Sequence, residues 1–552
     1  MRLSILASAA MAVAMAVPAL AIPADFQARA DALLKQSYPA AGPGAAVIVT
    51  DDGRTVYAAG QGLADVAAGR PIAPDTVFRL GSITKQFSAA IMLQLAAEGK
   101  VSLDDKLSKF FPDYPLPGAD ATVAQLLNHT VGVQSYTSIP GWMVEAKTSR
   151  AYSTEEMMAE FKDLPAPSKP GETFAYNNSG YVLVGAVIEK VTGKPWHQAV
   201  EERIAGPLGL TTIRYGVREG ETPRMAAGYT EREGKIVPAQ KIHMSVPHAA
   251  GALIGSVEDL AKWNAALHGG KVIPAAYYAQ MIAPTRLADG TTETYGFGIS
   301  NREIRSHKAI GHGGGIFGFS TDSIYLPEDD LFVAVFTNSD NPQTDPGMVM
   351  MQIAAMAVGD PFPTFEKEAL DAAAVEPWVG VYQVKDGERR VILRDGRLYT
   401  QRTGGGELEA HAAGDGRYFY PNSLTWFELK RDAKGAPVVA MYQQGSASAE
   451  ETVRSGPIPP EPKAAEVPRD TLQSYVGTYN SAIGAFTVAL PPEGAMTVQL
   501  AGQQPLPVQA VSATEFRTVG VDARIQFLAE SGKVTGLVLK QGGREMPAKR
   551  AD

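Results

Sequence analysis

The stretch FRLGSITKQF, residues 78–87, is the segment that most directly indicates the fold. It places Ser82 three residues before Lys85, directly after Gly81 and at the start of an apolar run that ends at Gly99. The run has the period of a helix over residues 82–99, and residues at i and i+3 share one helix face. Such a pair is either an N-cap serine with a solvated lysine, or a serine nucleophile beside the amine that takes its proton.

The composition limits what the chain can be. Its 552 residues predict several domains, and 45% apolar with 20% charged residues is typical of a globular protein with an ordinary core. A formal net charge of −9 argues against nucleic acid as a partner. The chain has no cysteine, so disulfides, thiol catalysis and Cys-ligated metals are excluded.

The first 21 residues, MRLSILASAAMAVAMAVPALA, have the pattern of a secretory signal. A basic start at Arg2 precedes an apolar stretch and a small-residue site, which predicts cleavage after Ala21 and a periplasmic protein. The alternative, a retained membrane anchor, is disfavoured because the apolar stretch is short and rich in alanine. No later segment approaches about 18 uninterrupted apolar residues, so no stable membrane insertion is expected after cleavage.

The remaining chain divides into a mixed region and a β-rich region. Residues 22–360 combine helical and strand patterns, with a hairpin signal at Asp52-Gly53, which predicts an α+β domain with an antiparallel sheet. From about residue 376 the pattern is β-rich, and an offset of 97 residues relates two copies, 376–454 and 470–552, across a proline-rich linker. Each copy is predicted to be a small antiparallel barrel. The offset superposes Gly380 on Gly477, Tyr382 on Tyr479, Phe419 on Phe516, Gly435 on Gly532 and Gly445 on Gly542.

A second chemical motif is Y-x-N, at Tyr176 and Asn178, followed by an apolar helical run. A phenol close to a lysine can have its pKa lowered and pass protons, and the amide could contact Lys85 or a substrate carbonyl. The same pattern recurs at residues 420–422 in the β-rich region, so Y-x-N alone is also compatible with an ordinary half-buried tyrosine.

The third motif is H-x-G in GHGGGIFGF, residues 311–319. Gly313, Gly314 and Gly315 are three successive glycines in a strand-like run, which suits a place where a ligand approaches the backbone closely. His312 could support proton transfer, and the Gly315 N–H could stabilise an oxyanion. Another H-x-G, at residues 268–270, lies at the end of a predicted helix and carries no such expectation.

The ordered set S-x-x-K, Y-x-N and H-x-G resembles the serine β-lactamase and penicillin-binding-protein superfamily, and is most similar to class C β-lactamases and D-stereospecific peptidases. Flanking segments agree, among them LLNHTVGV at 126–133 and AAGALIGSVEDLAKW at 249–263. The resemblance covers residues 25–360. It implies a five-stranded antiparallel sheet with a helical lobe and the site between them. Two small lipocalin-like barrels would follow this domain.

The resemblance also implies roles for the motif residues and requires no cofactor and no metal. Ser82 would be the acylated nucleophile, Lys85 its base or proton relay, and Tyr176 a general acid or base. Asn178 would contact the substrate, and His312 would lie on the strand that borders the site, with the backbone of Gly313 and Gly314 facing the substrate. The N–H groups of Ser82 and Gly315 would form the oxyanion hole.

Two departures from the family pattern affect the substrate prediction. Class C β-lactamases usually carry K-T-G where this chain has His312-Gly313-Gly314, and the missing lysine removes a fixed positive charge for a β-lactam carboxylate. An H-x-G version is similar to D-aminopeptidases and some D,D-peptidases. Val131 replaces a serine that is frequent in the family, and His129 beside it is interpreted as structural.

The sequence therefore predicts a periplasmic serine hydrolase that acts through an acyl-enzyme on small D-amino-acid amides, esters or peptides, as a D-aminopeptidase does. One alternative keeps the enzyme but makes it a class C-type β-lactamase or a carboxylesterase. Another is a degenerate, non-catalytic binding protein. The expected partner is a small-molecule or peptide substrate, and homodimerisation is left open. A D-aminopeptidase of this layout caps its site with a barrel loop, so a loop within residues 470–552 could reach the cleft.

Overall fold

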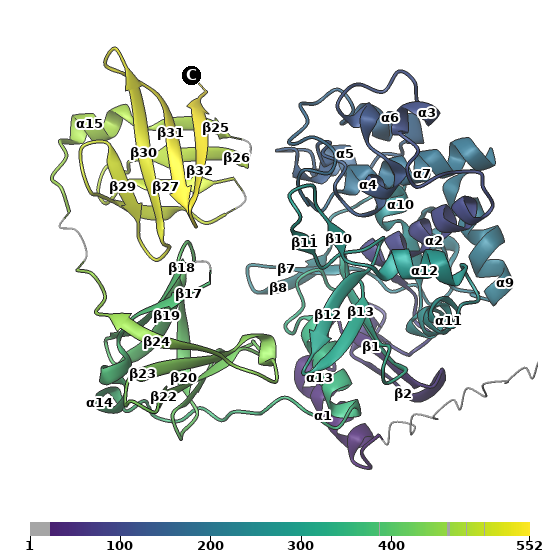
Figure 1. The fold of residues 1–552 in the computed structure, drawn as a ribbon, viewed down its shortest axis with the longest axis horizontal. Coiled ribbons are helices and arrows are strands. Elements are labelled where there is room, and N and C mark those ends of the chain that lie inside the picture. The colour runs from purple at the N-terminus through teal and green to yellow at the C-terminus, as the bar shows by residue number, and fades with distance from the viewer. Residues whose placement is uncertain (1–21, 386, 461–463, 482, 502, 552) are drawn as a thin grey trace, which may run out of the picture.

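The computed structural model describes residues 22–551 apart from 386, 461–463, 482 and 502 (Figure 1). The predicted signal segment, residues 1–21, lies outside the described residues. In the part of the chain that is described, no helix has both the length and the apolar character needed to cross a bilayer.

The mixed region is built on an antiparallel sheet with the order β12-β13-β15-β16-β1-β2. β14 also pairs with β15, in the same register as β13, so β13 and β14 are two parts of one strand interrupted at residues 312–313. The described sheet thus has six strand positions where the resemblance implied five. The strands are β1 (Ala45–Asp51), β2 (Arg54–Gln61), β12 (Ser300–Ile304), β13 (His307–Gly311), β14 (Gly314–Ile316), β15 (Phe319–Leu326) and β16 (Leu331–Thr337).

The central strands are apolar on both faces because the sheet separates two layers. Along β1, Val47 and Val49 belong to the core beneath α1 (Phe26–Ser37) and α13 (Pro346–Ala357), whereas Ala46 and Ile48 belong to the core of the helical lobe. This alternation follows from the two-residue period of a strand. Every position of β16 is buried for the same reason.

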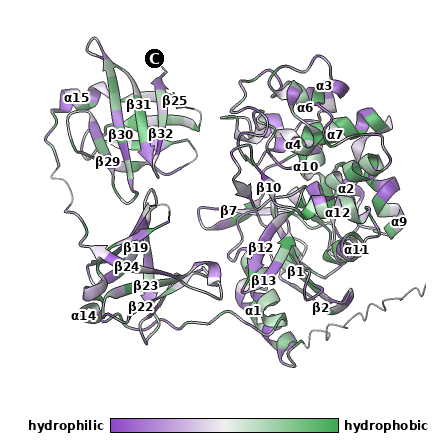
Figure 2. Ribbon diagram, in the orientation of Figure 1, coloured by the Kyte–Doolittle hydropathy of each residue, from purple (hydrophilic) through white to green (hydrophobic). Residues whose placement is uncertain are grey.

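The lobe covers the other face of the sheet and is centred on α2 (Thr84–Ala97) and α7 (Asn178–Thr192). α2 follows a 3-10 turn at Gly81–Ile83. It is buried almost all round, because other helices of the lobe, including α7 and α10 (His248–Gly251), pack against it. Figure 2 shows hydrophobic residues along α7 and hydrophilic residues along the hairpin that begins with β7. The other elements of the lobe include α3 (Leu107–Phe110), α4 (Val123–Leu127), α5 (Glu145–Thr148), α6 (Thr154–Ala159), α8 (Trp196–Val200), α9 (Gly206–Leu208), α11 (Val257–His268), α12 (Ala275–Ile282), β7 (Tyr229–Arg232) and β8 (Lys235–Pro238).

A small three-stranded sheet brings the serine motif next to α10. β5 (Phe78–Arg79) and β6 (Arg214–Tyr215) both pair with β9 (Leu253–Gly255). The Leu80 N–H continues this pairing by donating to the Leu253 carbonyl at 2.9 Å. Because β9 directly follows α10, the pairing fixes the carbonyl groups of α10 beside the start of α2.

The β-rich region forms two closed antiparallel barrels, which confirms the predicted fold class. The first consists of β17 (Gly380–Val384), β18 (Gly387–Arg394), β19 (Arg397–Arg402), β20 (Glu407–Ala412), β21 (Arg417–Phe419), β22 (Trp426–Arg431), β23 (Pro437–Tyr442) and β24 (Glu450–Gly456). The second consists of β25 (Gly477–Ser481), β26 (Gly484–Ala489), β27 (Thr497–Leu500), β28 (Leu506–Ala510), β29 (Glu515–Thr518), β30 (Ala523–Glu530), β31 (Lys533–Gln541) and β32 (Arg544–Arg550).

The 97-residue offset also relates individual hydrogen bonds in the two barrels. The Tyr382 hydroxyl donates to the Trp378 carbonyl at 2.7 Å, and the Tyr479 hydroxyl donates to the Tyr475 carbonyl at 2.6 Å. Both tyrosine rings are fully buried, so each hydroxyl needs such a partner.

Hydrogen bonds join the mixed region to the first barrel and the first barrel to the second. Arg305 of the mixed region donates to the Gly445 carbonyl of the first barrel at 2.6 Å. The Gly404 N–H of the first barrel donates to the Asp522 carboxylate of the second at 3.0 Å.

Candidate active site

Ser82 lies in the 3-10 turn that begins α2, where the backbone of strand β14 passes close by. Gly81 has a φ of +53°, a conformation that favours glycine. A Cβ on Gly81 would lie 3.0 Å from the Gly315 nitrogen. Glycine at position 81 is therefore what lets the serine turn and β14 approach each other.

Lys85 is fully buried one turn after Ser82. Its Nζ lies 3.0 Å from Ser82 Oγ and donates to Asn178 Oδ1 at 2.9 Å and to the Ala250 carbonyl of α10 at 2.8 Å. No carboxylate is among these partners. Burial therefore lowers the pKa of Lys85 well below its ordinary value.

The three contacts of Lys85 suit an uncharged amine. A neutral amine has two N–H groups and one lone pair, and the two acceptors Asn178 Oδ1 and Ala250 O take the two N–H groups. The lone pair is then left facing Ser82 Oγ, so the serine hydroxyl would be the donor of the third hydrogen bond. This arrangement could remove the proton from Ser82.

Asn178 is held at the start of α7 by groups of the lobe. Its neighbour Asn177 caps the helix by accepting from the Gly180 N–H at 2.9 Å. The Asn178 amide nitrogen donates to Thr137 Oγ1 at 3.1 Å, which orients its Oδ1 toward Lys85. Asn178 thus orients the lysine, and it also lines the first cavity at Ser82; its predicted contact with a substrate stays a prediction.

Tyr176 borders the cleft with its residue 42% exposed, and Lys85 Nζ lies 4.7 Å from the centre of its ring. Burial of the hydroxyl raises the pKa of Tyr176, although a hydrogen bond with the Ser82 side chain lowers it. The sequence argument expected a lysine to lower this pKa. That expectation is wrong because Lys85 faces the ring and is itself driven toward the neutral form. Tyr176 therefore stays protonated and could donate a proton.

His312 is buried and has both ring nitrogens occupied. Nδ1 lies 2.5 Å from the Gly313 carbonyl and Nε2 lies 2.8 Å from the Tyr295 hydroxyl. Because a carbonyl only accepts, Nδ1 carries the proton and Nε2 accepts from Tyr295. Burial and the nearby Lys85 lower the pKa of His312 to about 3, so the ring is neutral.

These contacts give His312 a different place from the one its motif suggested. Its nitrogens face Tyr295 and its own strand, and the ring centre lies 6.1 Å from the ring centre of Tyr176. His312 could therefore orient the tyrosines more readily than exchange protons with Ser82. Tyr295 lies 17 residues before His312 and outside every motif, so sequence reasoning missed it. His129 packs between the same rings, with its centre 4.2 Å from that of Tyr176.

The register of β14 against β15 shows where its N–H groups point. Ile316 pairs with Phe319 across a two-residue turn, which makes this a hydrogen-bonded pair. Hydrogen-bonded and non-hydrogen-bonded pairs alternate along an antiparallel ladder, so Gly315, opposite Ser320, directs its N–H away from β15. Ser82 and Gly315 line the same cavities, so the two N–H groups together could bind an oxyanion. Gly314 cannot be replaced without a shift, because a Cβ there would lie 2.0 Å from the Leu80 carbonyl oxygen.

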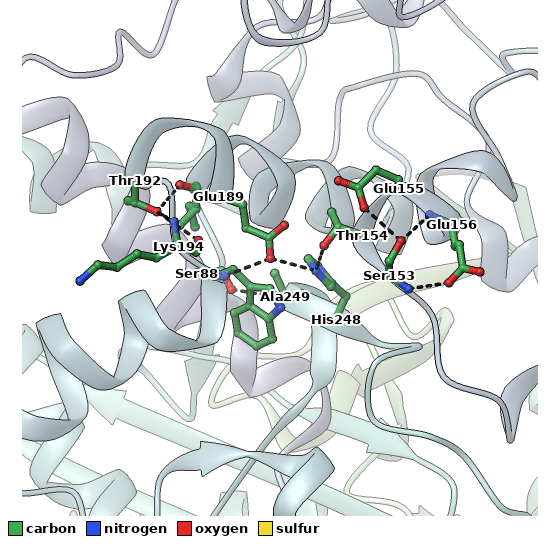
Figure 3. Close-up of polar contacts among 12 residues, drawn as sticks. Ser88, Ser153, Thr154, Glu155, Glu156, Glu189, Thr192, Lys194, His248 and Ala249 are labelled. Atoms are coloured by element: carbon green, nitrogen blue, oxygen red, sulfur yellow. Dashed lines mark hydrogen bonds and ion pairs between the residues drawn. The ribbon is translucent and has the colours of Figure 1, made fainter.

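Figure 3 shows polar contacts that His248 and Ala249 of α10 make with neighbouring helices. Ser88 of α2 donates to the Ala249 carbonyl at 2.8 Å, next to the carbonyl that Lys85 uses. His248 begins α10 with a φ of +45°, and its Nε2 lies 3.0 Å from Thr154 Oγ1 and 3.8 Å from Glu189 Oε1. The lobe thus fixes the acceptor that turns the lysine toward Ser82.

Two cavities meet at Ser82. The first has a volume of about 420 Å³ and is lined by Ser82, Asn178, Gly315 and mostly apolar side chains. The second has a volume of about 440 Å³ and is lined by Ser82 and Gly315 together with Tyr176 and His312. Among the described residues, neither barrel contributes to the lining of these cavities. The described chain also has no group of three or more acidic or histidine side chains placed to bind a metal ion.

Comparison with known proteins places this chain in a family. The model of the family described as Beta-lactamase matches residues 30–355. Penicillin-binding protein 4* of Bacillus subtilis is 25% identical over 432 residues, which cover 74% of this chain and 94% of that protein. D-aminopeptidase of Cereibacter sphaeroides is 26% identical over 361 residues, which cover 64% of this chain and 66% of that protein. The structure of a D-stereospecific amidohydrolase from Streptomyces sp. aligns with a TM-score of 0.51 and 28% identity, covering 60% of this chain and 98% of that one. The chain belongs to the β-lactamase family.

Proposed function

We propose that this protein is a serine hydrolase that forms an acyl-enzyme on Ser82 and acts on small D-amino-acid amides, esters or short peptides. The observation that carries the proposal is the buried Lys85, whose two N–H groups are taken by fixed acceptors so that its lone pair faces the Ser82 hydroxyl.

In the first step, Lys85 takes the Ser82 proton while Oγ attacks the substrate carbonyl carbon. The N–H groups of Ser82 and Gly315 stabilise the negative oxygen of the tetrahedral intermediate. The bond to the leaving amine or alcohol then breaks. The leaving group takes a proton from Tyr176, and the Lys85 ammonium, which lies beside the Tyr176 ring, then returns a proton to Tyr176 and becomes neutral.

In the second step, water replaces the leaving group. Lys85 is again neutral and takes a proton from the water, whose oxygen attacks the ester carbonyl. Collapse of the second tetrahedral intermediate breaks the bond to Ser82 Oγ and returns the proton to it. The products are a free amino acid or peptide acid and the amine or alcohol, and the enzyme is unchanged.

Two findings support D-configured substrates. The relatives include a protein named D-aminopeptidase, and the neighbouring structure is a D-stereospecific amidohydrolase. The His312-Gly313-Gly314 segment also lacks the lysine that would attract a β-lactam carboxylate. This absence favours the amidase over a β-lactamase.

We also propose that the protein is exported and organised as predicted. Residues 1–21 would be removed, residues 22–360 would form the catalytic domain, and 376–454 and 470–552 would be the barrel modules. N-terminal sequencing of the protein from a periplasmic extract should begin at Ile22. An uncleaved N-terminus in the membrane fraction would contradict this.

Hydrolysis assays test the catalytic proposal. The unchanged protein should hydrolyse D-alanine p-nitroanilide faster than the L-isomer and faster than nitrocefin. Ser82→Ala should lower kcat/KM by at least about 10⁴-fold, since it removes the nucleophile. A fluorophosphonate should add mass to Ser82 in the unchanged protein and none in the variant.

The control is Ser37→Ala, which removes a buried hydroxyl from α1, a helix that lines neither cavity at Ser82. Equal turnover by Ser82→Ala and the unchanged protein would refute the acyl-enzyme. A faster nitrocefin reaction would favour the β-lactamase alternative, and the absence of any labelling would favour a non-catalytic binding protein.

A further inference from the structure

The first cavity at Ser82 has one charged residue in its lining, Asp340. Apolar side chains make up most of the wall, including Met143, Ile242, Ile316 and Phe317. A pocket with an apolar wall and one carboxylate suits a group with an aliphatic stem and a cationic tip.

No cation of the described chain neutralises Asp340. Its Oδ2 accepts from the Gly318 N–H at 2.7 Å, and it takes part in no ion pair within the described residues. The nearby Arg79 donates to the Phe317 carbonyl, but both oxygens of Glu219 bind its guanidinium. The negative charge of Asp340 is therefore available to a ligand in the cavity.

The two cavities divide the substrate at Ser82. The leaving group must receive a proton, and the proton donor Tyr176 lines the second cavity and not the first. The leaving group therefore occupies the second cavity. The acyl part of the substrate, which stays on Ser82, occupies the first cavity with Asp340.

The hairpin between β14 and β15 sets the distance between the reacting carbonyl and Asp340. Gly315 holds the carbonyl oxygen, and Gly318, which donates to Asp340, lies three residues later at the hairpin tip. Three fully extended residues would span roughly 10 Å, and the turn at residues 317 and 318 makes the actual span somewhat shorter. An ammonium on the α-carbon is too close to the carbonyl to cover this distance, whereas a cation at the end of a lysine-length side chain covers it.

We propose that Asp340 is a specificity-determining residue that binds the cationic tip of the acyl residue's side chain. The preferred substrates are then amides or esters of D-lysine, D-ornithine or D-arginine, rather than of apolar amino acids of equal length. This inference rests on the proposed function, since it names the acyl residue that the same site accepts.

The test compares D-lysine p-nitroanilide with D-norleucine p-nitroanilide, which differ in the terminal ammonium and methyl groups. The unchanged protein should show a kcat/KM ratio of roughly tenfold or more in favour of D-lysine. Asp340→Asn keeps an oxygen acceptor for the Gly318 N–H and should bring the ratio close to one, because it removes the negative charge that favours D-lysine. Because the contact is electrostatic, the ratio of the unchanged protein should also fall as ionic strength rises.

The matched control is Glu328→Gln, which removes one negative charge at the far turn of the same sheet and should leave the ratio unchanged. A ratio near one in the unchanged protein, or a ratio that Asp340→Asn does not alter, overturns the role of Asp340 while the proposed hydrolase stands. If neither substrate nor any other D-amide is cleaved, the proposed function itself fails, and this inference fails with it. The unchanged protein decides the first of these outcomes even if the variant does not fold.

Discussion

Lys85 in the catalytic domain and Arg389 in the first barrel are both cationic side chains that folding removes almost completely from water. Lys85 Nζ has three oxygen atoms within 3.0 Å. Among the described residues, Arg389 Nη1 has no hydrogen-bond partner, and Nη2 lies 3.8 Å from a carboxylate oxygen of Glu450. A buried lysine can release its proton, whereas a guanidinium stays charged. Lys85, next to the cleft, can therefore lose its charge, whereas Arg389, in the barrel, cannot.

The second barrel shows that the first does not need its arginine to close. Arg389 pairs with Tyr382 across β17 and β18, and Phe486 pairs with Tyr479 at the equivalent place in β25 and β26. Phe486 is buried among aromatic and aliphatic side chains. The same barrel therefore forms with an apolar residue at this position. A buried cationic side chain therefore indicates function only where a neighbouring group can exchange a proton with it.

Among the variants that test this comparison of two buried cations, the largest effect is expected from replacing Lys85 with methionine, which has a similar length and no proton to exchange. Lys85→Met should lower kcat/KM for a D-amide by about 10³-fold or more, because Ser82 loses its base. The melting temperature should stay about the same or fall slightly, because a desolvated amine leaves the core but Asn178 Oδ1 and the Ala250 carbonyl lose a donor. The control is Lys35→Met at the exposed end of α1, which should change neither quantity. A Lys85→Met protein that is active, or that unfolds well below the unchanged protein, would contradict the comparison.

The pH dependence of kcat/KM is expected to report the proton on Lys85. Lys85 must be neutral to act, so kcat/KM should rise up to tenfold per pH unit until the lowered pKa of Lys85 is passed. His312, with its pKa near 3, remains neutral over this range.

The free energy of unfolding should also depend on the protonation of Lys85. Because the pKa of Lys85 is lower in the folded than in the unfolded chain, the unfolded chain binds more protons between the two values. The free energy of unfolding should therefore decrease as pH falls from the unfolded-state pKa toward the folded-state pKa. Denaturation curves at neutral and alkaline pH should show this slope for the unchanged protein and a smaller slope for Lys85→Met. Equal slopes would mean that Lys85 remains charged in the fold.

The smallest effect on activity is expected from exchanging the two equivalent barrel positions. Arg389→Phe should stabilise the protein by about 1–4 kcal/mol, because it replaces a poorly paired buried charge with an apolar side chain. Phe486→Arg should destabilise it by about 3–5 kcal/mol, because it buries a charge without a partner. Neither should change kcat/KM, since no described barrel residue lines the cavities at Ser82. Thermal denaturation and the D-amide assay measure both, and a stabilising Phe486→Arg would contradict the equivalence of the barrels.

Local sequence patterns were sufficient to predict several features of the fold and the site. The period of residues 82–99 predicted α2, and the i and i+3 spacing put Ser82 beside Lys85 because one helical turn brings such side chains together. The 97-residue offset predicted two copies of one module, and closed barrels formed at both places. These features depend on neighbours in the chain or on simple repetition, so a single sequence contains them.

Other features of the site depend on groups that leave no mark in the sequence. The acceptor that turns Lys85 toward Ser82 is a main-chain carbonyl 165 residues away, and every residue has such a carbonyl. Tyr295 occupies His312 Nε2 from outside any motif, and this contact reverses the expectation drawn from the histidine alone. The sequence by itself determined which residue types could react and that two of them share one helical turn. Only the tertiary structure decided the protonation of Lys85, the direction of the Gly315 N–H and the place of Asp340, because burial, strand register and cavity walls arise from packing between distant segments.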